Sequence, residues 1–201
     1  AAREQGNLAA EIVSFGRGKT KIDTDGCIRP DSSLEALADL KPAFDENGTV
    51  TAGTSSPLTD GAAAVLVVSE DYAERNGLDP LARIKAVAVA GCQPEIMGIG
   101  PVAATKKALA RAGLKVADID VIELNEAFAS QALACFDKLK LDGDKINIDG
   151  GAIALGHPLG ATGARITGKA AALLQRQGGR YALATQCIGG GQGIATILEA
   201  M

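Results

Sequence analysis

From residue 60 to the end of the chain, short apolar runs alternate with longer segments that carry a helical pattern. A continuous apolar run is typical of a strand that is buried on both faces of a sheet. Glycines follow the helical segments, and Pro101 opens one of them, as helix ends and starts favour. The expected strands are 62–68, 83–90, 121–124, 146–148, 181–187 and 194–198, and the expected helices are 72–76, 101–112, 125–139 and 161–177. This order predicts an α/β fold in which helices cover a buried sheet and the last strand is added antiparallel.

The first 57 residues have a less regular pattern. Residues 1–10 have a helical composition, and residues 10–13 could form a short strand. After a polar, glycine-rich stretch, a helix is expected to begin near residue 34, with Ser32 or Ser33 as its cap.

Composition excludes several classes of function. A net charge of −4 with dispersed basic residues argues against nucleic acid as the main partner. No apolar run reaches the roughly 18 residues that a membrane span needs. The four cysteines form no C-x-x-C pair, and a single histidine is too few for a usual zinc site, so we expect no metal and free thiols in a reducing compartment. The first residues lack a signal-peptide pattern and resemble the inside of a helix.

Three polar residues stand where predicted elements end. Cys187 closes an apolar run and precedes a block of glycines, where the thiol could move a proton and the N–H of Gly189 could bind an oxyanion. His157, the only histidine, lies in a glycine-bounded turn and could accept a proton from a thiol. Taken alone, either residue would more often be part of a core. Asn125 follows a predicted strand and could cap a helix, orient a water or substrate carbonyl, or do both.

Together these residues resemble a known family. The motifs Asn125-Glu126-Ala127-Phe128, Gly156-His157-Pro158-Leu159-Gly160 and Cys187-Ile188-Gly189-Gly190-Gly191 occur in the order and rough spacing of the thiolases, and residues 53–64 and 97–101 also match. The resemblance covers essentially the whole chain. Residues 51–60 and 150–155 look most like the 3-ketoacyl-CoA thiolases of fatty-acid β-oxidation, and the acetoacetyl-CoA thiolases are near neighbours.

The resemblance implies a role for each site residue. His157 would activate the nucleophilic cysteine, and Cys187 would be the second acid/base. Asn125, through a water, and His157 would bind one thioester oxyanion, while the N–H of Gly189 would form part of a second oxyanion hole. The implied substrate-binding residues are Ser56 at the pantetheine arm of CoA, with Phe128, Met97 and Ala127 beside the acyl-CoA. Coenzyme A is implied as a co-substrate, with no tightly bound cofactor.

The resemblance also implies an organisation in two similar halves. It assigns residues 1–57 to the loop region, 58–80 to the last strand and helix of the N-terminal domain, and 81–201 to the C-terminal domain. The implied fold is a mixed five-stranded sheet covered by helices, layered α-β-α-β-α when the N-terminal half is present. No cysteine here stands in the nucleophile's context, and strand 62–68 would have open edges that a partner must cover. We therefore expect a separate N-terminal polypeptide that carries the nucleophilic cysteine.

Several alternatives and partners follow from the same resemblance. The rival within the family is acetoacetyl-CoA thiolase, and the rival outside catalysis is a thiolase-like protein that binds acyl-CoA or lipid. Complete units would form a homodimer or tetramer, and a hydratase/dehydrogenase subunit is a further partner of β-oxidation types. A bacterial-type enzyme of this kind would be cytoplasmic.

Overall fold

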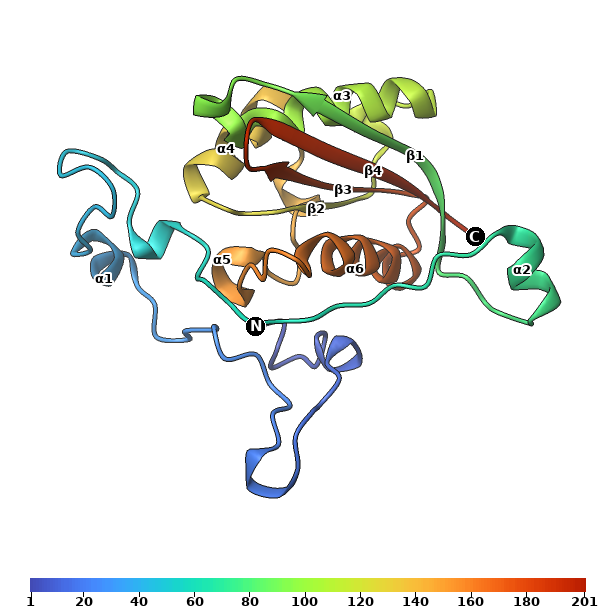
Figure 1. Ribbon diagram of the computed structural model, residues 1–201, viewed down its shortest axis with the longest axis horizontal. Coiled ribbons are helices and arrows are strands. Elements are labelled where there is room, and N and C mark those ends of the chain that lie inside the picture. Colours follow the sequence, from blue (N-terminus) through green and yellow to red (C-terminus); the bar gives the residue numbers. More distant parts are fainter.

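The computed structural model describes all 201 residues and centres on a four-stranded sheet with helices on both faces (Figure 1). The strand order is β1-β4-β3-β2, with β2 and β3 parallel and the other pairs antiparallel. The strands are β1 Ala82–Gly91, β2 Val121–Leu124, β3 Tyr181–Ile188 and β4 Gln192–Ala200. The helices are α1 Leu34–Ala38, α2 Glu70–Arg75, α3 Gly100–Ala112, α4 Ala129–Leu139, α5 Ala152–Leu155 and α6 Thr162–Gln177. This confirms the predicted α/β class and the antiparallel last strand.

Two apolar cores hold the layers together. On one face of the sheet, α3 and α4 bury alanines, leucines and Cys135 against alternate residues of β2, β3 and β4. On the other face, α6 packs Ile166, Leu173 and Leu174 against the intervening residues of the same strands. The strand period of two sends neighbouring residues to opposite cores, so β2 places Ile122 with α3 and α4 but Val121 with α6.

The predicted fifth strand, 146–148, is reduced to one parallel bridge between Ile146 and Ile122. Asn147 has a positive φ of 45°, which turns the chain out of the sheet. Its side chain then replaces the missing backbone pairing: Oδ1 accepts from the N–H of Leu124 at 2.9 Å, and Nδ2 donates to the carbonyl of Leu124 at 2.8 Å. The five-stranded count was therefore wrong for this chain, because the side chain of Asn147 pairs with Leu124 where a ladder of backbone bonds would continue.

The predicted strand 62–68 is not a strand in the structure. Residues 61–69 run extended alongside α6 without sheet partners (Figure 1). Val65, Leu66 and Val67 are 46%, 77% and 67% exposed. The apolar pattern was identified correctly, but a strand also needs a neighbour, and none of the described strands borders this segment.

Most helix ends in the structure lie where the sequence predicts them. α3 and α6 end at Gly113 and Gly178, both in the left-handed region that glycine favours. The hydroxyl of Ser33 accepts from the N–H of Ala36 and caps α1, as expected. The expected start of a helix at Asn125 was wrong: α4 begins at Ala129, and its N-cap is Phe128.

The expected helix over 1–10 and the short strand over 10–13 are also absent. Residues 2–8 form turns, and residues 9–11 form a single 3₁₀ turn. This N-terminal stretch is polar and is held by charge rather than by its own secondary structure. None of the helices in the structure has the length and apolar character that crossing a bilayer requires.

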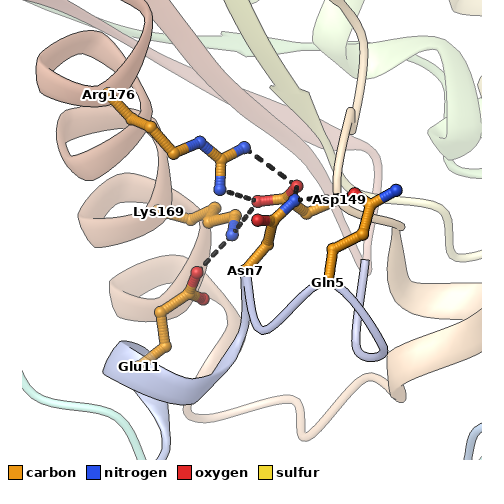
Figure 2. A network of polar contacts seen from close by, with 6 residues as sticks. All are labelled: Gln5, Asn7, Glu11, Asp149, Lys169 and Arg176. Carbon is orange, nitrogen blue, oxygen red and sulfur yellow. Dashed lines mark hydrogen bonds and ion pairs between the residues drawn. The ribbon is translucent and has the colours of Figure 1, made fainter. Parts of the chain in front are cut away.

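A charge network with a buried centre joins the N-terminal stretch to the C-terminal half of the chain (Figure 2). At its centre, the carboxylate of Asp149 forms ion pairs with Lys169 and Arg176 of α6. Arg176 Nη1 lies 2.7 Å from Asp149 Oδ2. Glu11 forms an ion pair with Lys169, and Asn7 Nδ2 donates to Asp149 Oδ1 at 3.2 Å. Burial opposes ionisation of Asp149, but hydrogen bonds from Arg176 and Lys169 outweigh it and hold the pKa of that carboxyl below its usual range.

Candidate active site

His157 stands in the loop that joins α5 to α6. Gly156 ends α5 with a φ of +99°, and a Cβ there would lie 2.5 Å from Oγ1 of Thr59, so only glycine fits. A Cβ at Gly61 would lie similarly close, 2.8 Å from Cγ of Pro158, the residue that follows His157 in the chain. The segment 59–61 therefore packs directly against the histidine loop and fixes its position.

Both ring nitrogens of His157 have hydrogen-bond partners. Nε2 lies 3.3 Å from Nδ2 of Asn125, and Nδ1 lies 2.7 Å from Oγ1 of Thr162. Burial, and then the positive charge of Arg165, lower the pKa of His157 below its usual value. The ring is therefore neutral at neutral pH, which is the form that can accept a proton.

Asn125 follows β2 and is almost completely buried. Its backbone N–H donates to the carbonyl of Thr185 in β3, which extends the parallel pairing beyond β2. Its side chain points at His157 rather than at the start of α4, so it does not serve as the helix cap that the sequence allowed. Oδ1 of Asn125 is buried and has no hydrogen-bond partner in the chain, which is unusual outside functional sites.

Cys187 lies at the end of β3, opposite Gly193 of β4. Burial raises the pKa of the Cys187 thiol, with a smaller contribution from Cys92, so the sulfur carries its proton at neutral pH. Gly189 opens the turn into β4, and a Cβ built there would meet nothing within 4 Å, so a ligand could approach its backbone. Gly191 must be glycine, because it has a φ of +91° and a Cβ would lie 2.4 Å from the carbonyl oxygen of Cys92.

The expected substrate-binding residues form two groups. Ser56 donates from its N–H and its hydroxyl to the carbonyl of Ala127, at 3.0 and 3.2 Å, and Ser55 forms a β-bridge with Phe128. The structure thus brings Ser56, Ala127 and Phe128 together, although they are 71 residues apart along the chain. Met97 lies in the turn before α3, where its carbonyl is 3.9 Å from the sulfur of Cys92, and no contact places it with the other three.

An open hollow of about 510 Å³ lies beside His157. Its walls are Leu58, Thr59, Asp60, His157 and Leu159. This volume lies in the range of small-molecule sites. No group of three or more His, Cys, Asp or Glu side chains is arranged to hold a metal ion.

Sequence reasoning missed three polar residues around the site. Glu126 accepts from Asn147 Nδ2 at 2.8 Å and from the N–H of Ile153 at 3.1 Å, so it ties the end of β2 to α5. Thr162 contacts the histidine ring. Glu123 lies on β2, two residues before Asn125, and is buried. A strand's alternation could have identified Glu123, because a residue two positions from Asn125 faces the same side.

Burial also gives Glu123 an unusual charge state. Desolvation raises its pKa to about 8, against the opposing charges of Arg165 and Lys169. Oε1 of Glu123 has no hydrogen-bond partner in the chain. The residue is therefore a neutral acid at neutral pH, held between the sheet and α6.

Comparison with known proteins decides the family. The model of the thiolase C-terminal domain matches residues 78–200, and that of the thiolase N-terminal domain matches residues 1–71. The chain belongs to the thiolase family. Thiolases are acyltransferases, and the motif-based assignment is thereby confirmed.

Individual relatives agree with this assignment. The chain is 60% identical to a 3-ketoacyl-CoA thiolase of Shewanella frigidimarina, over 99% of this chain and 54% of the relative. It is 55% identical to that of Marinobacter nauticus, over 98% and 53%. The chain thus spans about half the length of the curated thiolases that it matches.

Solved structures share the fold. Human mitochondrial 3-ketoacyl-CoA thiolase in complex with CoA superposes with a TM-score of 0.96 at 48% identity, over all of this chain and 51% of that one. The Bacillus anthracis acetyl-CoA acetyltransferase gives a TM-score of 0.94 at 44% identity, over 100% and 52%. These values confirm the predicted thiolase fold.

Proposed function

We propose that this chain supplies the proton-transfer half of a 3-ketoacyl-CoA thiolase site, which acts in fatty-acid β-oxidation. The observation that carries the proposal is the contact of Asn125 with a neutral His157 beside an open hollow, in a chain of the thiolase family. The reaction is the cleavage of 3-ketoacyl-CoA by CoA into acetyl-CoA and a shortened acyl-CoA. It proceeds through an acyl group held on a cysteine.

In this proposal the protons move between named groups. His157 takes the proton of the nucleophilic thiol, whose sulfur attacks the 3-keto carbon. The bond between C2 and C3 then breaks, and Cys187 gives its proton to the acetyl-CoA carbanion that leaves. The resulting thiolate of Cys187 takes the proton of the incoming CoA thiol, whose sulfur attacks the acyl thioester. The nucleophilic cysteine leaves as a thiolate and takes back the proton that His157 held.

One feature supports a proton carrier rather than a nucleophile at Cys187. Its pKa is raised, so the thiol holds a proton to donate. A nucleophilic cysteine needs the opposite, a lowered pKa from a nearby positive charge or helix start. The N–H of Gly189 would stabilise one oxyanion, and His157 together with a water on Asn125 would stabilise the other. Ser56, Ala127, Phe128 and Met97 would contact the acyl-CoA.

The nucleophilic cysteine is proposed to lie in an N-terminal thiolase half that joins this chain. Supporting this, the chain spans about half of its relatives, and residues 61–69 expose an apolar, extended segment. In the proposed complex the segment becomes a strand of the partner's sheet, and the domain division at 57 and 80 applies. Complete units are proposed to form a homodimer or tetramer in the cytoplasm, with a hydratase/dehydrogenase subunit as a further partner.

The second candidate activity is that of an acetyl-CoA acetyltransferase, favoured by the superposition on the Bacillus anthracis enzyme. A non-catalytic acyl-CoA-binding role fits less well, because Asn125, His157 and Cys187 are all present.

The test is reconstitution. The N-terminal half of the Shewanella frigidimarina relative is expressed with this chain, and thiolysis is followed with 3-ketoacyl-CoA of several chain lengths. We expect activity on 3-ketoacyl-CoA substrates longer than acetoacetyl-CoA, lost on His157→Ala and on Cys187→Ala. Activity on acetoacetyl-CoA alone would favour the acetyltransferase, and full activity of both variants would contradict the assigned roles.

A further inference from the structure

The ring nitrogen of His157 that faces away from Asn125 meets a hydroxyl group. Nδ1 lies 2.7 Å from Oγ1 of Thr162, the first residue of α6. Thr162 is completely buried. The contacts of its hydroxyl are His157 Nδ1 and the carbonyl of Pro158.

The local fold explains why this hydroxyl is fixed. The carbonyl of Pro158 accepts the N–H groups of Ala161 and Thr162, both at 2.9 Å, and so forms the turn that starts α6. The hydroxyl of Thr162 donates to the same carbonyl at 3.0 Å. A hydroxyl has one proton to give, so Oγ1 is left to accept from His157.

The two sides of the ring therefore indicate the same tautomer. A bond from Nδ1 to Thr162 Oγ1 requires the proton on Nδ1. On the other side, Nδ2 of Asn125 donates to Nε2, which requires Nε2 to be without a proton. In a neutral imidazole only one nitrogen carries a proton, and the bond to Thr162, whose own hydroxyl proton goes to the carbonyl of Pro158, assigns it to Nδ1.

We propose that Thr162 is a positioning residue that holds the ring proton of His157 on Nδ1 and so keeps Nε2 unprotonated, as the ring nitrogen that accepts a proton. The inference rests on the proposed function, in which Nε2 takes the proton of a thiol. That transfer leaves a thiolate and an imidazolium, and the Nδ1–H of the imidazolium keeps its bond to Thr162. The hydroxyl thus selects the reactive tautomer and also stabilises the charged product of the transfer.

The chain offers a direct measurement, because His157 is its only histidine. In the ¹⁵N-histidine-labelled full chain at a pH where the ring is neutral, long-range ¹H–¹⁵N spectra distinguish the two nitrogens without assignment ambiguity. We expect a protonated, pyrrole-like Nδ1 and an unprotonated, pyridine-like Nε2. The opposite pattern in the unmodified chain would overturn the proposal, whatever the variants do.

Two variants and one control separate the hydroxyl from its packing. Thr162→Val keeps the side-chain shape and removes the hydroxyl, so the Nδ1–H preference should be lost. Thr162→Ser keeps the hydroxyl and should retain the pattern. Thr167→Val is the matched control, because Thr167 makes the same type of bond to Gly163 four residues back on α6, at 2.7 Å. A Thr162→Val spectrum like that of the unmodified chain would refute the role of the hydroxyl.

The reconstituted complex gives a second readout. Thr162→Val should slow acyl-enzyme formation by about tenfold to a hundredfold, which is at most the lower bound of the roughly 10²- to 10⁴-fold that general acid–base catalysis contributes. Thr162→Ser and Thr167→Val should stay near the unmodified rate. If no variant and no unmodified complex forms an acyl-enzyme, the proposed function fails, while the tautomer measurement still decides the role of Thr162. An unchanged rate in Thr162→Val with a changed tautomer would show that Thr162 does not serve the reaction.

Discussion

At the scale of single residues, the site depends on side chains that burial keeps neutral. His157, Cys187 and Glu123 all lie where desolvation disfavours their charged forms. A neutral imidazole accepts a proton and a neutral thiol donates one, so the same physical effect would prepare both for the proposed transfer. Arg165 lowers the pKa of both His157 and Glu123, and so it links the site to the interior beneath α6.

The pKa of His157 provides the first prediction. In an NMR titration of the full chain, its value should fall below the ordinary 6.5 of histidine. Arg165→Gln removes a positive charge and should move the pKa upward, though not to the ordinary value, because burial is the larger cause. Arg75→Gln, in the distant helix α2, should leave it unchanged. A value at or above 6.5 in the unmodified chain would contradict the electrostatic account.

Glu123 provides a prediction about stability and pH. Its folded pKa of about 8 exceeds the unfolded value of 4.5, so the folded state binds the extra proton between these two pH values. The free energy of unfolding should therefore decrease as pH rises from about 5 to 8, by up to about 1.4 kcal/mol per pH unit from this residue. Glu123→Gln should flatten that decline in urea-unfolding curves. An unchanged pH slope would show that Glu123 is ionised in the folded state.

At the scale of elements, the N-terminal stretch depends on α6. Residues 7–11 make no strand or α-helix of their own, and their long-range polar contacts lead to Asp149 and Lys169. The carboxylate of Asp149 is buried between two cations, a geometry in which removal of one partner leaves an uncompensated charge.

Lys169→Met should therefore release residues 1–11 and cost about 3 kcal/mol of stability. Hydrogen exchange should increase at residues 5–11 in this variant, and the urea midpoint should fall. Lys106→Met, on the exposed side of α3, is the control and should behave like the unmodified chain. Unchanged exchange at residues 5–11 in Lys169→Met would show that other contacts hold the stretch.

The helices and strands also show which parts of the fold can be predicted from the sequence. Periodicity and glycine stops located α3, β2, α6 and the two last strands closely, because each is defined by its own residues. The predictions of strands failed where a contact with another part of the protein decides whether a segment forms a strand. Asn147 replaces a strand by a side-chain bond, and residues 61–69 need a neighbouring strand. Motifs identified His157, Asn125 and Cys187, but Thr162 became visible only when the turn at Pro158 brought it to the ring.

At the scale of the whole molecule, an extended apolar segment lies uncovered along the side of α6 that faces away from the sheet. Residues 61–69 cross this side with apolar side chains in solvent, and extended apolar segments of this kind tend to associate (Figure 1). The proposed N-terminal half would cover the segment and bring its cysteine to His157. Site assembly and burial of the segment would then be a single event.

Leu66→Asp should weaken the association with the N-terminal half by placing a charge in the new interface. Native mass spectrometry of the mixed halves should show a reduced fraction of the one-to-one complex. Leu34→Asp, at an exposed leucine of α1, is the control for a general effect of charge. Equal complex formation by Leu66→Asp and the unmodified chain would exclude residues 61–69 from the interface.

Mass spectrometry of the intact chain and of its peptides, after brief exposure to 3-ketoacyl-CoA, locates the sulfur that carries the acyl group. We expect no adduct on this chain alone. With the N-terminal half present, we expect one acyl group on a cysteine of that half, lost on His157→Ala. An acyl group on Cys187 of this chain would refute the proposed role of that residue, because it would make the sulfur a nucleophile rather than a proton carrier.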